Sequence, residues 1–124
     1  VELIHRKMKT LLGQEGAFLD DVKFCPHHPD RGYPEENPAY KIACHCRKPD
    51  IGMIEECVQK YNIDLSQSWL VGDTTVDIRT GKNAGCGTVL VLTGEAGRDG
   101  KYNDPPDVVS ADLLTSVTQI LDGR

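Results

Sequence analysis

Residues 68–92 read SWLVGDTTVDIRTGKNAGCGTVLVL and contain two apolar runs with a polar helical segment between them. The second run, 88–92, is an unbroken series of β-branched and aliphatic residues, which is typical of a strand covered on both faces. Between the runs we predict a helix over about 75–84, ended by Gly85 because glycine adopts a left-handed conformation without a steric penalty. Two strands joined through a helix predict a parallel pair with a right-handed crossover.

The flanking segments extend this pattern in both directions. Apolar residues recur at helical spacing in three further segments: 1–12, 51–62 and 113–121. We expect Asp50 and Ser110 to cap the second and third of these helices. Short strands are predicted at 18–24 and at 108–109, and the latter could instead extend the Gly- and Pro-containing loop over 93–106. The sequence therefore predicts an α/β domain with a partial Rossmann-like parallel sheet flanked by helices.

Composition narrows the classes of function. A chain of 124 residues with 39% hydrophobic and 27% charged residues is typical of one soluble globular domain. No apolar run approaches the ~20 residues of a membrane span. The net charge of -5, with no basic cluster larger than Arg47-Lys48, argues against nucleic-acid and membrane partners. Five cysteines without a visible signal peptide favour a reducing compartment, so we expect a cytoplasmic protein.

The stretch 25–48, CPHHPDRGYPEENPAYKIACHCRK, has neither helical nor strand periodicity. A loop of this length in a compact domain needs something to hold it. Three thiols and an imidazole at its two ends can form a closed tetrahedral Cys3His shell for Zn2+. The ligands that we predict are these four: Cys25, His27, Cys44 and Cys46.

Two alternatives to this zinc site remain open. His28 or His45 could replace the predicted histidine ligand, although each is more simply a loop residue. A disulfide with spare thiols is the other alternative, but an odd number of cysteines favours a metal. Cys57 and Cys86 lie in apolar periodic segments, and we expect them only to pack.

Acidic residues follow the first apolar run. Asp73 comes directly after Gly72 at the expected carboxyl end of a strand, where ligands bind in open α/β sheets. Asp77 lies one helical turn later on the same side. Two such carboxylates can bind Mg2+, a hard cation that prefers oxygen ligands. The alternative is that Asp73 or Thr74 only caps the helix and that Asp77 only favours its positive end.

Lys48 follows the predicted zinc loop and could face the same crevice. A lysine and a Mg2+ together neutralise a phosphate, and the helix that begins near Asp50 adds backbone donors. Arg47 offers a fork of donors suited to a second phosphate or a sugar oxygen. The simpler alternative is that both cations are a solvated surface pair.

These residues carry a resemblance. Lys48 followed by Gly72-Asp73-x-x-x-Asp77 resembles the third and fourth motifs of the haloacid dehalogenase (HAD) superfamily. The CPHHP…CHCRKP stretch resembles the zinc-loop branch of that superfamily. Within the branch it is most similar to the phosphatases of D-glycero-D-manno-heptose 1,7-bisphosphate, and more distantly to histidinol-phosphatase domains. The resemblance implies a phosphomonoester hydrolase that acts on a sugar bisphosphate through an aspartyl-phosphate, with histidinol phosphate as the rival substrate.

The resemblance also implies roles for individual residues. Structural zinc would be bound by the four residues named above. Lys48 would contact the phosphoryl group as a catalytic residue, and Arg47 would recognise the substrate. Asp73 would bind the catalytic Mg2+, and Asp77 would be a supporting carboxylate.

Two motifs of the family are missing. Its nucleophile motif, Asp-x-Asp followed by Gly-Thr, precedes these elements, and Asp20-Asp21 does not match it in spacing or context. The second motif, a Ser or Thr ending a strand before the first helix, is also absent. With Val1 opening directly into a helical pattern, we expect residues 1–124 to be the C-terminal two-thirds of such an enzyme: one incomplete HAD-like domain without the nucleophile strand, inactive alone.

Three partners follow from that expectation. They are a phosphorylated sugar substrate, the missing N-terminal segment of the same domain, and further molecules associating through an uncovered sheet. A different class of function is also open, namely a non-catalytic binding module stapled by zinc.

Overall fold

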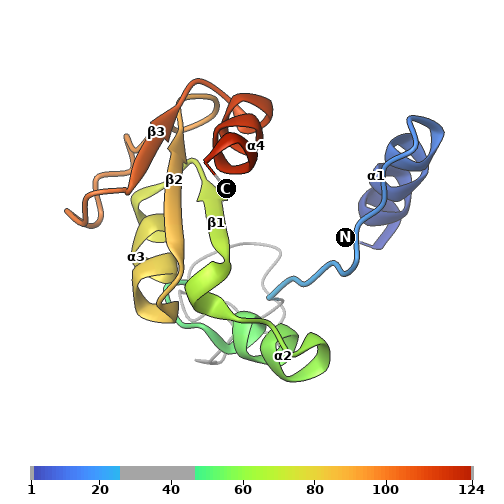
Figure 1. Ribbon diagram of the computed structural model, residues 1–124, viewed down its shortest axis with the longest axis horizontal. Coiled ribbons are helices and arrows are strands. Elements are labelled where there is room, and N and C mark those ends of the chain that lie inside the picture. Colours follow the sequence, from blue (N-terminus) through green and yellow to red (C-terminus); the bar gives the residue numbers. More distant parts are fainter. Residues whose placement is uncertain (1, 26–46, 124) are drawn as a thin grey trace, which may run out of the picture.

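The structure, a computed structural model, describes residues 2–25 and 47–123 (Figure 1). Along the chain the described elements are α1 (Glu2–Gln14), α2 (Gly52–Tyr61), the short 3-10 helix η2 (Leu65–Gln67), β1 (Trp69–Gly72), α3 (Thr75–Ala84), β2 (Gly87–Val91), β3 (Val108–Ser110) and α4 (Leu113–Asp122). The strand–helix–strand unit predicted over 68–92 is present as β1, α3 and β2.

The sheet is parallel and has the order β1-β2-β3. Its register places Leu70 beside Thr88, and Val91 beside Ser110. Helices flank this sheet, so the predicted α/β class with a parallel Rossmann-like sheet is confirmed (Figure 1). The brief strand predicted near 108 is also real, as the third strand of the sheet.

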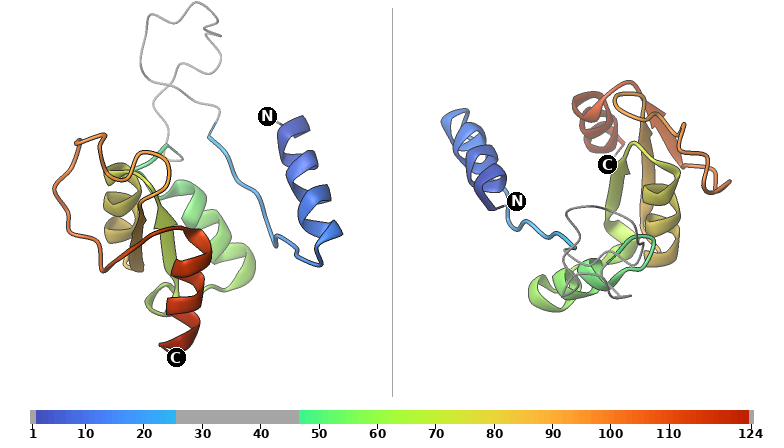
Figure 2. Two further views of the ribbon diagram at one scale, coloured as in Figure 1. Left: turned by 90° about the horizontal axis from the view of Figure 1, so that it is seen from above. Right: turned by 180° about the vertical axis from the view of Figure 1, so that it is seen from behind.

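Helices α3 and α4 cover different parts of the sheet (Figure 2). Helix α3 packs on β1 and β2, while α4 packs on β3 and β2. At Gly81, α3 approaches β2 so closely that an added Cβ would overlap the side chain of Thr88. The buried apolar core consists of three side chains among the described residues: Ile78, Val89 and Val91.

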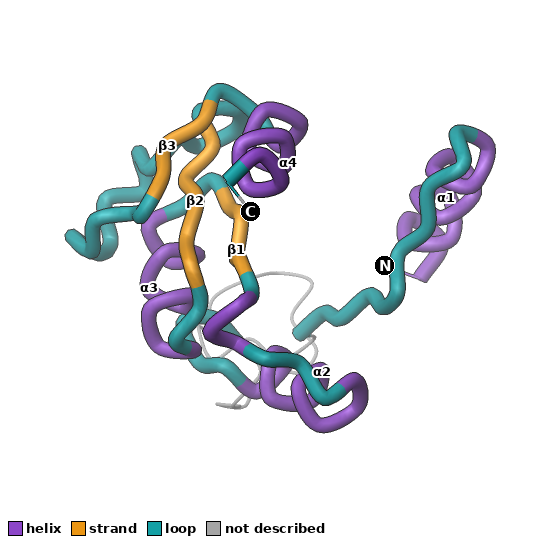
Figure 3. The backbone as a smooth tube through the Cα atoms, in the orientation of Figure 1, coloured by secondary structure: helices purple, strands orange, loops and turns teal. Residues whose placement is uncertain are grey.

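Helix α1 confirms the helix predicted near the start of the chain, but it stands apart from the sheet (Figures 1 and 3). Its apolar side chains are exposed: Leu3 by 78%, Ile4 by 72% and Leu11 by 53%. Strand β1 has a neighbour on one edge only in the part of the chain that is described. Among the helices of that part, none combines the length and apolar character that crossing a membrane requires.

The strand predicted over 18–24 is wrong. This segment runs as an irregular stretch between α1 and the end of the first described range. Its polar contacts go to side chains: the backbone N–H of Val22 donates to Asp21, and the Tyr61 hydroxyl donates to the Asp20 carbonyl and to Asp21. The alternation of Val22 and Phe24 is therefore not enough to predict a strand, because a strand also needs a neighbouring strand with which to form backbone hydrogen bonds.

Two of the three predicted helix-end residues are also wrong. Gly85 does end α3 in the left-handed region, at a φ of 81°. Ile51, not Asp50, is the N-cap of α2, and no side chain caps it. Ser110 is buried at the end of β3 and donates to the Gln119 side chain, whereas Asp112 caps α4 by accepting the Thr115 N–H at 2.7 Å.

Candidate functional site

The carboxyl end of β1 turns directly into α3. At this turn Gly72 lies against the Asp77 side chain, and a Cβ on Gly72 would overlap the Asp77 carboxyl group. Glycine is therefore required here for close approach rather than for an unusual φ angle. The turn brings both predicted acidic residues to the same edge of the sheet.

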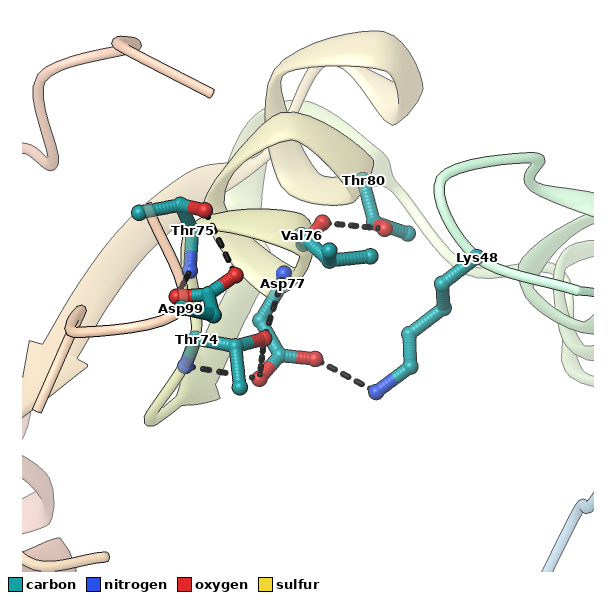
Figure 4. A network of polar contacts seen from close by, with 7 residues as sticks. All are labelled: Lys48, Thr74, Thr75, Val76, Asp77, Thr80 and Asp99. Carbon is teal, nitrogen blue, oxygen red and sulfur yellow. Dashed lines mark hydrogen bonds and ion pairs between the residues drawn. The ribbon is translucent and has the colours of Figure 1, made fainter. Parts of the chain in front are cut away.

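Thr74 and Asp77 form a reciprocal cap at the start of α3 (Figure 4). The Thr74 hydroxyl accepts the Asp77 backbone N–H at 3.1 Å. In return, Asp77 Oδ2 accepts the Thr74 backbone N–H at 3.2 Å and the Thr74 hydroxyl at 2.8 Å. The alternative that Thr74 is a helix cap is thus correct, and this cap uses one oxygen of the Asp77 carboxylate.

Lys48 reaches the other oxygen of the same carboxylate. Its Nζ lies 2.5 Å from Asp77 Oδ1, although the two residues are far apart in the sequence (Figure 4). The Lys48 side chain is 46% exposed and that of Asp77 only 9%. Burial raises the pKa of Asp77, but the hydrogen bonds from Lys48 and Thr74 outweigh burial and hold its pKa below the ordinary range. The Asp77 carboxylate is therefore ionised at neutral pH, and its contact with Lys48 places the lysine beside the carboxyl end of β1.

Asp73 presents a partly used carboxylate at this edge. The residue is half-buried, and its Oδ2 accepts the backbone N–H of Glu95 at 2.9 Å. Its Oδ1 accepts no hydrogen bond from the residues that the structure describes. A carboxylate oxygen that no described residue occupies fits Mg2+, which prefers oxygen ligands. Asp77 has both oxygens occupied, so it fits a supporting role and not that of a direct ligand.

The loop that follows β2 folds back over α3. Asp99 Oδ1 accepts the backbone N–H of Thr75 at 2.8 Å, and its Oδ2 accepts the Thr75 hydroxyl at 2.6 Å (Figure 4). Further along the loop, Asp104 accepts from Arg79 Nε at 2.7 Å. The loop was predicted from the sequence, but neither Asp99 nor the glycine-rich start of the loop was predicted to contact the site. No local pattern marks Asp99, since its partner lies 24 residues earlier.

Arg47 lies next to Lys48 and is half-buried. Its carbonyl accepts the Asp50 N–H at 3.0 Å, which closes a turn before α2. Asp50 therefore belongs to this turn and does not cap α2.

Most of the predicted zinc loop lies outside the described residues. Of the predicted ligands only Cys25 is described, and His27, Cys44 and Cys46 are not. His28 and His45 are outside as well. Within 2–25 and 47–123 no group of three metal-binding side chains occurs. In the structure Cys25 is disulfide-bonded, which agrees with the alternative to zinc given above. The zinc site and the loop boundaries 25–48 stay predictions.

The chain matches a known family and several known proteins. Residues 45–116 match the HAD-hydrolase-like family. A D-glycero-beta-D-manno-heptose-1,7-bisphosphate 7-phosphatase from Pseudomonas aeruginosa is 31% identical over 98% of the chain. A D-glycero-D-manno-heptose-1,7-bisphosphate 7-phosphatase from Thermosynechococcus vestitus is 38% identical over 95% of it.

A solved structure has the same fold. It is the D,D-heptose 1,7-bisphosphate phosphatase from Bordetella bronchiseptica complexed with magnesium and phosphate, with a TM-score of 0.81, 32% identity and 99% of the chain covered. The chain spans 62% of the length of each of the two relatives above and 64% of this solved chain.

Proposed function

The chain belongs to the HAD-hydrolase-like family, and from this premise we propose that it supplies the phosphate- and metal-binding part of a sugar-bisphosphate phosphatase. The observation that carries the proposal is the contact between Lys48 Nζ and Asp77 Oδ1 at 2.5 Å. It brings a lysine that follows the predicted zinc loop to the turn that holds Asp73. A cation and an available carboxylate oxygen therefore share one edge of the sheet, as phosphate and Mg2+ require.

Each residue has a distinct task in this proposal. Lys48 donates one hydrogen bond to Asp77, and its remaining N–H groups can donate to a phosphoryl oxygen. Asp73 would hold Mg2+ with its carboxylate, and the ion would supply charge neutralisation for the phosphoryl group. The nucleophile is a carboxylate outside this chain, which would form an aspartyl-phosphate that water hydrolyses. Fixed charges of this kind contribute most of the catalysis in phosphoryl transfer.

The proposed substrate is D-glycero-D-manno-heptose 1,7-bisphosphate, because both relatives and the solved structure are named as phosphatases of a heptose 1,7-bisphosphate. Cleavage at position 7 is proposed because both relatives are named 7-phosphatases. Arg47, next to Lys48 in the chain, would bind the second phosphate or a sugar oxygen with its planar fork of donors. Histidinol phosphate is the rival substrate and lacks a second phosphate for Arg47 to bind.

A phosphate-release assay tests the proposal. The protein would be this chain fused to an upstream strand that carries the Asp-x-Asp motif of the family. We expect Mg2+-dependent release of one phosphate from the heptose bisphosphate, loss of activity with a chelator, and much slower release from histidinol phosphate. Preference for histidinol phosphate would contradict the assignment of the substrate.

We also propose structural zinc at Cys25, His27, Cys44 and Cys46. Four such ligands predict about one zinc per chain, which metal analysis can measure. Cys44→Ser should lower the zinc content, whereas Cys57→Ser, at a free cysteine in α2 and not among the proposed ligands, should not. Reduced thiols without zinc would contradict the proposal. Thiolate ligands persist in a reducing compartment, so we propose a cytoplasmic protein.

The partner that we propose is an additional strand beside β1, supplied by the segment with the nucleophile motif. Its support is that β1 has no neighbouring strand on one side among the described residues, and that apolar side chains of α1 are exposed, such as Ile4 at 72%. An uncovered edge and apolar surface promote association. Light scattering should therefore show self-association of the chain alone and none of the fusion. A strictly monomeric chain with slow amide exchange throughout β1 would contradict this.

A further inference from the structure

The start of the loop after β2 contacts Asp73 in two places. The backbone N–H of Glu95 donates to Asp73 Oδ2 at 2.9 Å, and that of Gly97 donates to the Asp73 carbonyl at 2.8 Å. One short stretch of backbone thus holds both the main chain and one carboxylate oxygen. The hydrogen bond occupies Oδ2, whereas no hydrogen bond from the described residues reaches Oδ1.

Gly94 makes this approach possible. Its φ of +67° lies in the left-handed region, and a Cβ at this position would overlap Oδ2 of Asp73. Any other residue would displace the carboxylate or pull the backbone of Glu95 away from it. Gly94 is therefore needed both for its φ angle and for the space that its missing side chain leaves.

The far end of the same stretch is fastened to the first turn of α3. Asp99 accepts the Thr75 N–H at 2.8 Å and the Thr75 hydroxyl at 2.6 Å. Partial desolvation raises the pKa of Asp99, but the hydrogen bonds from Thr75 outweigh it and keep the pKa below its ordinary range. The Thr75 hydroxyl in turn accepts the Lys101 N–H at 3.1 Å. The segment is thus tied to both sides of the turn that carries Asp73.

We propose that residues 94–99 are a positioning element for Asp73, and that Gly94 is the residue on which it depends. The element holds the carboxylate through a hydrogen bond to Oδ2 and leaves Oδ1 without a hydrogen bond from the described residues. Groups that orient a metal ligand in this way typically change metal affinity by about 10- to 100-fold when removed. The inference rests on the proposed function only in naming Mg2+ as what Asp73 holds.

Gly94→Ala and Gly100→Ala form a matched pair for the test. Both glycines have positive φ angles, +67° and +59°, so alanine is strained at both. A Cβ at Gly100, however, would meet only the Arg98 carbonyl at 3.9 Å. The difference between the two variants therefore isolates the contact with Asp73.

Two quantities are measured by NMR on the isotopically labelled 124-residue chain: the exchange rate of the Glu95 amide, and the Mg2+ dissociation constant from amide shifts. For Gly94→Ala we expect Glu95 exchange and the dissociation constant each to rise about tenfold or more. For Gly100→Ala both should stay within about twofold of the wild-type chain. Asp73→Ala leaves the loop sequence intact and should also accelerate Glu95 exchange.

Each outcome decides a separate point. A wild-type exchange rate at Glu95 in Gly94→Ala or in Asp73→Ala would overturn the positioning element. Equal effects of Gly94→Ala and Gly100→Ala would also overturn it, since backbone strain alone would then explain them. If the wild-type chain binds no Mg2+ while Glu95 responds as expected, the metal role of Asp73 fails and the positioning element stands.

Discussion

Thr74 joins the strand end to the helix through one hydroxyl group. That hydroxyl accepts the Asp77 N–H and donates to the Asp77 carboxylate, so it orients the same side chain that holds Lys48. The sequence motif allowed two readings of this turn, a metal site or a helix cap. The structure shows that the cap is formed by Thr74 and Asp77 and does not use Asp73, so a metal site at Asp73 stays a prediction beside the cap.

Removing the Thr74 hydroxyl should weaken the start of α3. We expect Thr74→Ala to lower the free energy of unfolding by about 1 kcal/mol, because an N-cap hydrogen bond is lost. Thr118→Ala is the control, since the Thr118 hydroxyl only donates to the Leu114 carbonyl on an exposed helix face. Urea unfolding measures both, and equal effects of the two substitutions would contradict the cap.

The pKa of Asp77 predicts a dependence of stability on pH. This pKa lies below its ordinary value in the folded state, so the ionised group contributes stability above the unfolded pKa of about 4, and that contribution is lost as the pH falls through the folded pKa. The difference in free energy of unfolding between the wild-type chain and Asp77→Asn should therefore be constant near neutrality and shrink below about pH 4. Urea titrations from pH 7 to pH 3 measure it. A difference that does not change with pH would contradict the ion pair with Lys48.

At the scale of elements, the predictions that succeeded were those that depend on neighbouring residues in the sequence. The strand–helix–strand unit and the glycine stop at Gly85 were found because periodicity and φ preference are properties of neighbouring residues. The strand predicted over 18–24 and the caps predicted at Asp50 and Ser110 failed because their true partners are remote or shifted. Ser110, for example, accepts the Leu92 N–H with its carbonyl and donates its hydroxyl to Gln119, so its side chain does not cap α4.

Packing of α3 on the sheet depends on Gly81. A Cβ there would overlap the side chain of Thr88, so Gly81→Ala should lower the free energy of unfolding by about 1 to 3 kcal/mol. Gly13→Ala is the matched control, because Gly13 lies in α1 with no atom within 4 Å of an added Cβ. The control should be neutral or stabilising by up to about 1 kcal/mol. Denaturant unfolding distinguishes the two, and a neutral Gly81→Ala would contradict the close contact.

At the scale of the whole molecule, the fold places Lys48 and Asp73, the residues proposed to contact phosphate and metal, at the carboxyl ends of the strands. Among the described residues, β1 has a neighbouring strand on one side only. Lys48 and Asp73 were predicted from a motif, and the contact of Lys48 with Asp77 is what places Lys48 near the turn that carries Asp73. The contacts of Asp99 and Gly94 with the same turn could not be predicted from the sequence, because each joins residues that are more than 20 positions apart. The zinc loop, read only from its residue types, stays a prediction.

The central claim is that Asp73 provides the metal ligand of a phosphatase site that Lys48 completes. The most direct test is phosphate release from heptose 1,7-bisphosphate by the fusion with the Asp-x-Asp strand, compared between Asp73→Asn and Asp122→Asn. Asp122 lies at the end of α4, outside the proposed site, and is the matched control. We expect Asp73→Asn to lower kcat/KM by about 100-fold or more, since a bound Mg2+ contributes several kcal/mol, and Asp122→Asn to leave it unchanged. Full activity of Asp73→Asn would contradict the claim.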